Sequence, residues 1–239
     1  MQQNILEVRD IAVHYGGVKA VDGVNFAVTR GEIHGLIGPN GAGKSTVIDA
    51  MTGRRRPTRG QVLLNGQDVT ALGVIERRQL GLARSFQRTS IFPEMRVYDQ
   101  IELAAYKVGA RHPEANTAEV LHQLELSRMA HLTAAELGYG EQRRLDLALA
   151  LVGQPSLLLL DEPMAGLSAQ ESEDLARHLQ TLAQQWSVSV LLVEHDMDIV
   201  FGISHTVTVF ELGRVIASGE PAAVRAHPRV REAYLGSAA

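Results

Sequence analysis

The segment that most constrains this chain is a glycine-rich stretch at residues 38–46. It matches the pattern G-x-x-x-x-G-K-[ST] at every fixed position and consists of Gly38, Pro39, Asn40, Gly41, Ala42, Gly43, Lys44, Ser45 and Thr46. The apolar run before it, at residues 31–37, is typical of a buried strand, and residues 45–52 favour the first turns of a helix. Glycines let backbone N–H groups curl around a phosphate at the N-terminus of such a helix, where the helix dipole favours anions. The stretch therefore predicts a nucleotide-binding protein.

Two side chains of this stretch have specific expected roles. Lys44 is expected to reach the β- and γ-phosphates of the nucleotide, and the Ser45 hydroxyl is expected to ligate Mg²⁺. The alternative interpretation, a glycine-rich structural turn, is rare for a motif of this length and context.

Composition narrows the class of protein further. A length of 239 residues suits one large domain or a core with an inserted subdomain. The net charge of −4 predicts no nucleic-acid partner, and the absence of cysteine excludes disulfides and cysteine-ligated metals and fits a reducing cytosol. The N-terminus lacks the features of a signal peptide, and no apolar run approaches the roughly 18 residues that a spanning helix needs. If the protein works at a membrane, a partner is expected to supply the transmembrane part.

The order of secondary-structure patterns suggests a sheet-containing core with a helical insertion. Residues 5–28 alternate apolar and polar positions around Gly16 and Gly17, which predicts antiparallel strands. Residues 61–66 predict a strand that ends in an Asn-Gly turn, and residues 97–152 have mostly helical spacing.

After the helical stretch, strand patterns return. The apolar runs at residues 156–160 and 187–193 are each typical of a strand that is buried on both faces of a parallel sheet. Between them we expect a helix over residues 169–186, because Ser168 and Glu171 form the pattern of a capping box.

Two carboxylates follow the first of these buried runs. Asp161 and Glu162 stand at the carboxyl end of the predicted strand, which is the edge where open α/β sheets bind ligands. Asp161 is suited to hold Mg²⁺, directly or through water, and Glu162 is suited to orient and deprotonate the water that attacks the γ-phosphate. A solvated acidic pair before Pro163 is the alternative, and the neighbouring phosphate-binding stretch favours the catalytic interpretation.

Two further polar residues follow apolar runs. His195 lies two residues beyond the run that ends at Val193, and Gln87 follows the short apolar stretch at residues 83–86. A structural histidine and an ordinary surface glutamine are the alternatives. If both belong to the site, four strand ends, near Gly38, Gln87, Asp161 and His195, surround one nucleotide.

The helical insertion contains a second glycine-rich helix entry at residues 137–142, before an amphipathic helix that runs through Val152. Two glycines before a helix can form another anion-binding turn, although such an entry is often only a cap.

Taken together, the order of these motifs resembles that of the ATP-binding subunit of an ABC transporter, over nearly the whole chain. The resemblance implies that residues 38–46 are the Walker A motif and residues 158–161 the Walker B motif, with Glu162 as the catalytic glutamate. It places Gln87 in the Q-loop and His195 at the H-loop switch, so the implied catalytic residues are Glu162, His195 and Gln87, and the implied Mg²⁺ ligands are Ser45, Gln87 and Asp161.

The resemblance also implies the residues that bind the rest of ATP. Tyr15 matches the aromatic residue that stacks on adenine in this family. Residues 137–142 align with the family signature LSGGQ, so that the expected contacts to ATP come from Gly138, Tyr139, Gly140 and Glu141. Two positions depart from the family pattern: Gly138 replaces the usual Ser, and Ser168 replaces the usual Asp of the D-loop.

The fold that the resemblance implies is an α/β P-loop NTPase (RecA-like) core with an antiparallel β subdomain and an inserted α-helical signature subdomain. We expect the core and β subdomain at residues 1–88 and 154–239, and the helical subdomain at residues 89–153. The implied cofactors are ATP and Mg²⁺.

The implied partners are a second ATP-binding subunit, identical or different, and transmembrane permease subunits. In the family, two ATP-binding domains pair head to tail, so that each ATP lies between one Walker A motif and the opposite signature. The permease is expected to contact residues 87–106 and the helical insertion, a periplasmic solute-binding protein is an indirect partner, and the chain is expected at the cytoplasmic face of the inner membrane.

Less specific motifs indicate which subfamily of ABC transporters the chain resembles. Residues 83–95, 137–145 and 230–236 are similar to the corresponding segments of branched-chain amino acid importers, although amide, urea or aromatic-acid importers can share them. The alternatives are the ATPase of a lipid or lipopolysaccharide exporter and a non-transport ABC ATPase. A small-molecule kinase leaves the signature and His195 unexplained, and a GTPase needs an Asn-Lys-x-Asp motif, whereas no Asn in this chain precedes a Lys.

Overall fold

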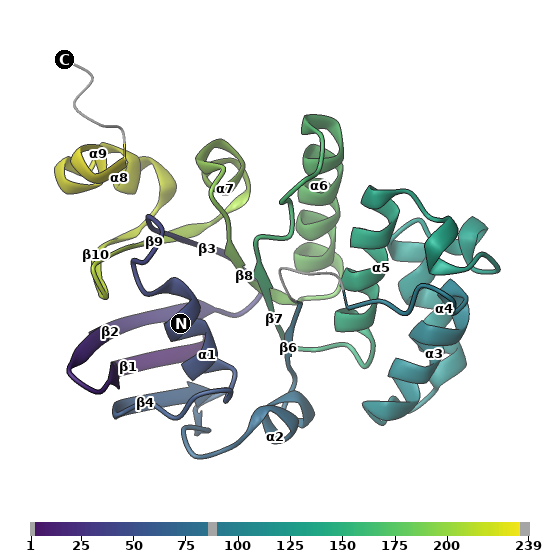
Figure 1. The fold of residues 1–239 in the computed structure, drawn as a ribbon, viewed down its shortest axis with the longest axis horizontal. Helices are drawn as coiled ribbons and strands as arrows, with labels where there is room; N and C mark the ends of the chain where they lie inside the picture. Colours follow the sequence, from purple (N-terminus) through teal and green to yellow (C-terminus); the bar gives the residue numbers. More distant parts are fainter. Residues whose placement is uncertain (1–2, 86–89, 235–239) are drawn as a thin grey trace.

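A mostly parallel sheet lies at the centre of the molecule (Figure 1). The computed structural model describes residues 3–85 and 90–234. Within them this sheet has six strands, in the spatial order β10 (Arg214–Gly219), β9 (Thr206–Glu211), β3 (Ile33–Ile37), β8 (Ser189–Val193), β7 (Leu157–Asp161) and β6 (Leu82–Arg84). All neighbours pair in parallel except β10, which pairs antiparallel with β9.

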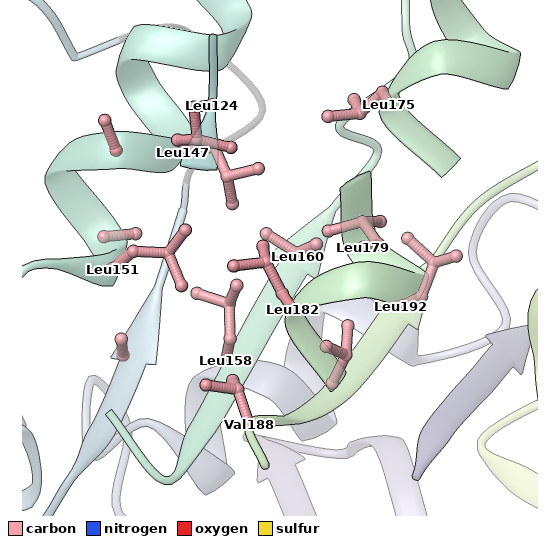
Figure 2. Packing of buried hydrophobic residues seen from close by; sticks show 14 of the residues in the cluster. Leu124, Leu147, Leu151, Leu158, Leu160, Leu175, Leu179, Leu182, Val188 and Leu192 are labelled. Carbon is pink, nitrogen blue, oxygen red and sulfur yellow. The ribbon is translucent and has the colours of Figure 1, made fainter. Parts of the chain in front are cut away.

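Strand β7 is buried on both faces, as its continuous apolar sequence predicts. Leu158 and Leu160 point to one side, where they pack with leucines of helices α5 (Tyr139–Leu151) and α6 (Ala169–Gln185), as Figure 2 shows. Leu157 and Leu159 belong instead to the cluster on the other face, together with apolar residues of α1 (Lys44–Met51). Because strand side chains alternate between faces, one apolar run serves two cores.

A second, antiparallel sheet packs beside α1 and has the strand order β2 (Val18–Thr29), β1 (Asn4–Tyr15), β4 (Arg59–Leu64) and β5 (Gln67–Asp68). The β4–β5 turn contains Asn65 and Gly66, whose φ angles are 52° and 77°. Positive φ at both central residues is typical of the tight hairpin turn that Asn-Gly favours.

The helical insertion lies beyond the β6 edge of the central sheet (Figure 1). It contains α3 (Val97–Lys107), α4 (Pro113–Gln123), short 3₁₀ turns at Ser127–Met129 and Ala134–Glu136, and α5. The remaining helices are α2 (Val74–Gln79), before β6, and α7 (Met197–Ile203), α8 (Pro221–Ala226) and α9 (Pro228–Tyr234), which lie near the C-terminus.

The predicted fold class is therefore confirmed: a P-loop core carries an antiparallel sheet and a helical subdomain. The subdomain boundaries placed at residues 88/89 and 153/154 stay predictions. In the described part of the chain, the helices are too short or too polar to cross a membrane.

Candidate nucleotide-binding site

The strand order places several predicted site residues on one edge of the sheet. Strand β8 lies between β3 and β7, and Val193, its last residue, pairs with both Leu36 and Asp161. The segments that follow these strands, with Gly38, Asp161 and His195, therefore emerge side by side at the carboxyl edge. The fourth expected residue, Gln87, follows the neighbouring strand β6 but lies outside the described residues.

The phosphate-binding loop between β3 and α1 needs glycine for steric reasons at both ends. A Cβ on Gly38 would lie 2.7 Å from the carbonyl oxygen of Phe210, and Gly43 has a φ of 103°. A side chain at Gly43 would also meet the carbonyl oxygen of Ala20 at 2.8 Å. The backbone N–H of Ala42 donates to the Pro39 carbonyl at 3.1 Å and closes the turn. The loop thus owes its shape to positions that only glycine can occupy without strain.

Lys44, the first residue of α1, is 7% exposed, and its Nζ donates to the carbonyl oxygens of Gly38 at 2.5 Å and Pro39 at 3.2 Å. Burial lowers the pKa of Lys44, while the negative charges of Glu162 and Asp161 oppose that shift. Both acids therefore act electrostatically on the lysine that we expect to contact the phosphates.

Glu162 and His195 form a direct pair across 33 residues of sequence: His195 Nε2 lies 2.5 Å from Glu162 Oε1. The backbone of Glu162 has a φ of 52°, in the left-handed region that non-glycine residues rarely adopt, and its N–H donates to the Val193 carbonyl at 2.8 Å. Strained backbone of this kind is frequent at active sites. The arrangement can hold the Glu162 carboxylate in one orientation, as a general base requires.

Glu194 supports this pair and was missed by the sequence reasoning. It is 5% exposed, its Oε1 accepts the Met164 N–H at 2.7 Å, and its Oε2 accepts the His195 N–H at 3.1 Å. Burial raises the pKa of Glu194. The carboxylate joins the turn after Glu162 to the turn that carries His195. Its position next to His195 was the only sequence signal available.

Asp161 is also held by an unexpected partner, Arg84. The Arg84 guanidinium donates to Asp161 Oδ2 at 2.9 Å and to Asp49 Oδ1 at 2.7 Å. The described residues contain no group of three or more His, Cys, Asp or Glu suited to a metal ion. Protein sites for Mg²⁺ commonly use only one or two carboxylates together with substrate phosphates, so the oxygen donors Asp161 and Ser45 fit this ion.

Tyr15 stands at the end of β1, and its neighbouring strand β2 contacts the phosphate-binding loop through Ala20. Its ring is stacked by the guanidinium of Arg55, whose Cζ lies 4.1 Å from the ring centroid, and Tyr15 is 43% exposed. The exposed ring is available for stacking, as the expected contact with adenine requires. Arg55 was not singled out from the sequence.

In the signature segment, residues 137–142, the first glycine contacts a carboxylate of the same segment. Gly138 precedes α5, and its N–H donates to Glu141 Oε2 at 2.7 Å. A Cβ on Gly140 would lie 2.5 Å from Glu171 Oε1, so this carboxylate approaches the start of α5 closely. The Tyr139 hydroxyl donates to the Ala165 carbonyl at 3.0 Å.

Ser168, at the predicted D-loop, belongs to the predicted capping box. Its hydroxyl donates to Glu171 Oε2 at 2.7 Å, and its backbone N–H donates to the same oxygen at 2.8 Å. The capping box at the start of α6 is thus present, with the Glu171 N–H donating to Ser168 Oγ at 3.3 Å.

The signature turn lines a cleft of its own. Gly138, Gly140 and Glu141 line a cleft of about 1300 Å³ between α5, α6 and the segment around Ser127. Among the described residues, the walls of this cleft include none from residues 38–46. Glu162 thus acts electrostatically on Lys44, whereas Gly138 and Gly140 line a separate cleft.

Comparisons with known proteins identify the family. The sequence profile of the family described as "ABC transporter" matches residues 21–165, and that of "Branched-chain amino acid ATP-binding cassette transporter" matches residues 214–239. The chain is 36% identical to the high-affinity branched-chain amino acid transport ATP-binding protein BraF of Pseudomonas aeruginosa, with 100% of both chains covered. It is 37% identical to the protein of the same description, LivG, of Escherichia coli K12, again over 100% of both.

Solved structures with a similar fold also belong to ABC transporters. An ATP-binding cassette of an ABC transporter in its ADP conformation matches with a TM-score of 0.86 and 29% identity, covering 98% of this chain and 99% of the other. The structure of cbiO1 from Clostridium perfringens, part of the ABC transporter complex cbiONQ, matches with a TM-score of 0.88 and 27% identity, covering 99% of this chain and 96% of the other.

Proposed function

Since the chain belongs to the ABC transporter family and is an ATPase subunit of that family, we propose that it drives the import of branched-chain or similar hydrophobic amino acids. The observation that carries the proposal is the end-to-end match, at 36% and 37% identity, to two branched-chain amino acid transport ATP-binding proteins. The match of residues 214–239 to the branched-chain amino acid family supports the same substrate class independently of the core motifs.

The residues of the sheet edge supply the steps of hydrolysis. The backbone amides of residues 38–46 and the Lys44 ammonium bind the phosphates of ATP. Ser45, Asp161 and Gln87 would hold Mg²⁺, which would neutralise charge on the β- and γ-phosphates. Glu162 accepts the proton of the attacking water, and His195 keeps the Glu162 carboxylate in place through the contact at 2.5 Å.

The signature turn acts on the ATP of a second subunit. Because Gly138 and Gly140 lie apart from the chain's own phosphate-binding loop, a complete site needs the signature of another ATP-binding subunit, either a second copy or a related chain. Tyr15 stacks on the adenine of the chain's own ATP.

Permease subunits supply the membrane-spanning part of the complex, and a periplasmic solute-binding protein delivers the amino acid. We place the chain at the cytoplasmic face of the inner membrane, where the permease contacts residues 87–106 and the helical insertion. Transport ATP-binding proteins among the relatives support this assembly.

The test is amino acid uptake in a strain without a duplicate cassette. Deleting the gene is expected to abolish ATP-dependent uptake of leucine, isoleucine and valine at low external concentration. The wild-type gene should restore uptake, whereas a copy with Glu162→Gln should not. Unchanged uptake in the deletion strain would contradict the substrate but not the ATPase, and cross-linking of the chain to a lipid-export pathway would favour an exporter instead.

A further inference from the structure

One ion-pair network lies beside the proposed site and connects three elements that carry it. Arg84 is the last residue of β6, Asp49 lies on α1, and Asp161 ends β7. The side chain of Arg84 is only 10% exposed, and those of Asp161 and Asp49 are 14% and 34% exposed. One nitrogen of the guanidinium donates to each carboxylate, at 2.7 Å to Asp49 Oδ1 and at 2.9 Å to Asp161 Oδ2.

Such a network is weak evidence for stability alone. Burying charges costs solvation free energy, and a buried ion pair can often be replaced by apolar residues without loss of stability. A planar guanidinium does, however, fix the direction of each carboxylate it contacts, which a flexible ammonium does not. The network is therefore better suited to orientation than to holding the fold together.

The carboxylate that is oriented is the one expected to serve Mg²⁺. A carboxylate has two oxygens with two lone pairs each, so Arg84 can hold Oδ2 of Asp161 while Oδ1 serves the ion or its water.

The position of Arg84 adds a connection between elements. Strand β6 has three residues, pairs with β7, and is the outermost strand of the sheet order in the described part of the chain. Its link to α1 is carried by the Arg84–Asp49 pair, and α1 begins with Lys44 and Ser45. Arg84 thus ties the strand before Gln87 to the helix after the phosphate-binding loop.

We propose that Arg84 is a positioning residue for Asp161: its guanidinium fixes the carboxylate that binds Mg²⁺ and joins it to α1 through Asp49. The proposal rests on the proposed function, because it takes Asp161 as a ligand of Mg²⁺. Partners that orient metal ligands typically change metal affinity by roughly 10–100-fold when they are removed.

The test measures binding of Mn²⁺, as a probe for Mg²⁺, to the full-length chain with a non-hydrolysable ATP analogue, by electron paramagnetic resonance. Arg84→Met and Arg84→Lys should each weaken Mn²⁺ binding by about tenfold, because neither side chain holds both carboxylates in a fixed geometry. Affinity for the analogue in EDTA should change less than about twofold, because Arg84 does not act on the nucleotide directly. Asp49→Asn should cause a smaller loss of Mn²⁺ affinity.

Arg78 provides a matched control. Its guanidinium donates to the carbonyl oxygens of Val152 at 2.6 Å and Ala150 at 3.3 Å, at the end of α5. Arg78, like Arg84, is partly buried. Arg78→Met should lower the melting temperature and leave Mn²⁺ affinity unchanged, which separates loss of a partly buried arginine from loss of positioning.

The outcomes distinguish the proposed role of Arg84 from the proposed role of Asp161 as a ligand of Mg²⁺. Unchanged Mn²⁺ affinity in folded Arg84→Lys and Arg84→Met, together with weaker binding in Asp161→Asn, would overturn the role of Arg84 alone. Tighter Mn²⁺ binding in Arg84→Met would also overturn it, because Arg84 would then be a competing cation. Unchanged binding in Asp161→Asn would overturn the Mg²⁺ role of Asp161 and with it the proposal for Arg84.

Discussion

The start of α1 and the start of α5 use the same physical device, a helix N-terminus after a glycine-rich turn, in opposite electrostatic settings. The first turn of α1 contains no acidic residue and begins with Lys44. The first turn of α5 contains Glu141, whose carboxylate accepts the N–H of Gly138, and the Glu171 carboxylate lies close to Gly140.

The two helix starts therefore differ in how readily each can accept a phosphate. At α1, a cation and a shaped loop favour an incoming phosphate. At α5, the Glu141 carboxylate of the chain itself already accepts the Gly138 N–H, and the Glu171 carboxylate lies close to Gly140. A phosphate that approaches α5 must therefore exchange with these carboxylates. We call residues 38–46 with the neighbouring sheet edge the loop half of the expected site, and residues 138–141 the signature half. In the loop half, Lys44 exchanges its contacts with the Gly38 and Pro39 carbonyls for a phosphate. In the signature half, the Glu141 carboxylate has to release the Gly138 N–H.

The largest expected effect tests the loop half. Glu162→Gln removes the general base, so turnover should fall by roughly 10²–10⁴-fold while ATP binding is kept. Steady-state ATPase rates and equilibrium nucleotide binding check both parts. Glu173→Gln, an exposed acid that lines the same groove as Glu162, is the control and should hydrolyse ATP normally. Turnover close to that of the wild type would place the base elsewhere.

The next largest effect, on ATP affinity, is expected at Tyr15, the last residue of β1. Tyr15→Ala should weaken ATP binding by about 1–3 kcal/mol, by analogy with base–aromatic stacking, and Tyr15→Phe should not. Isothermal titration with ATP measures the difference. If both variants bind equally well, the ring has no role in binding adenine, and the contact with Arg55 is its main interaction.

A third variant tests whether the signature half must rearrange. Gly140→Ala places a Cβ 2.5 Å from Glu171 Oε1, so the carboxylate has to move away from the α5 amides. Alanine gains roughly 1 kcal/mol in helix propensity, so stability should hold. We expect a severalfold change in ATPase rate with unchanged ATP affinity.

The matched variant at this helix entry is Gly138→Ala, whose Cβ would lie 3.3 Å from Glu141 Oε2 and should disturb the turn less. Equal effects of both substitutions on the ATPase rate would argue that the contact with Glu171 is incidental.

A smaller effect is expected from Tyr139→Phe. The variant loses the hydrogen bond to the Ala165 carbonyl at 3.0 Å, and Arg143 loses the tyrosine oxygen as an acceptor at 3.1 Å. Urea unfolding should show a loss of about 1 kcal/mol. ATP affinity should stay the same, because the contact belongs to the signature half. A loss of ATP affinity without loss of stability would break the separation of the two halves.

The smallest expected effect is on how the melting temperature depends on pH, and it involves Glu194, next to His195. Burial raises the pKa of Glu194 above 4.5, so the folded protein binds this proton more tightly than the unfolded chain. The contribution of Glu194 to stability is therefore present below 4.5 and is lost as pH rises through its folded pKa. Melting temperatures across this window should fall less steeply with pH for Glu194→Gln than for the wild type. Parallel curves would mean that Glu194 has an ordinary pKa.

The sequence predicted the parts of the fold that depend on local spacing. The hairpin around Gly16, the Asn65–Gly66 turn, the buried strand β7 and the capping box of Ser168 and Glu171 each follow from residues close together in the chain. The phosphate-binding loop was equally clear, because its glycines and Lys44 occur at a fixed spacing that few other structures require.

By itself, the sequence determined the family and predicted the residues of the site, and only the tertiary structure decided how these residues meet. The placement of β8 between β3 and β7 brings His195 to Glu162, and the guanidinium of Arg84 contacts both Asp49 and Asp161. Periodicity and motifs report contacts along a few turns of chain, whereas strand order and ion pairs between distant segments depend on how whole elements pack. For that reason Arg84 and Glu194 resembled ordinary polar residues until the fold placed them.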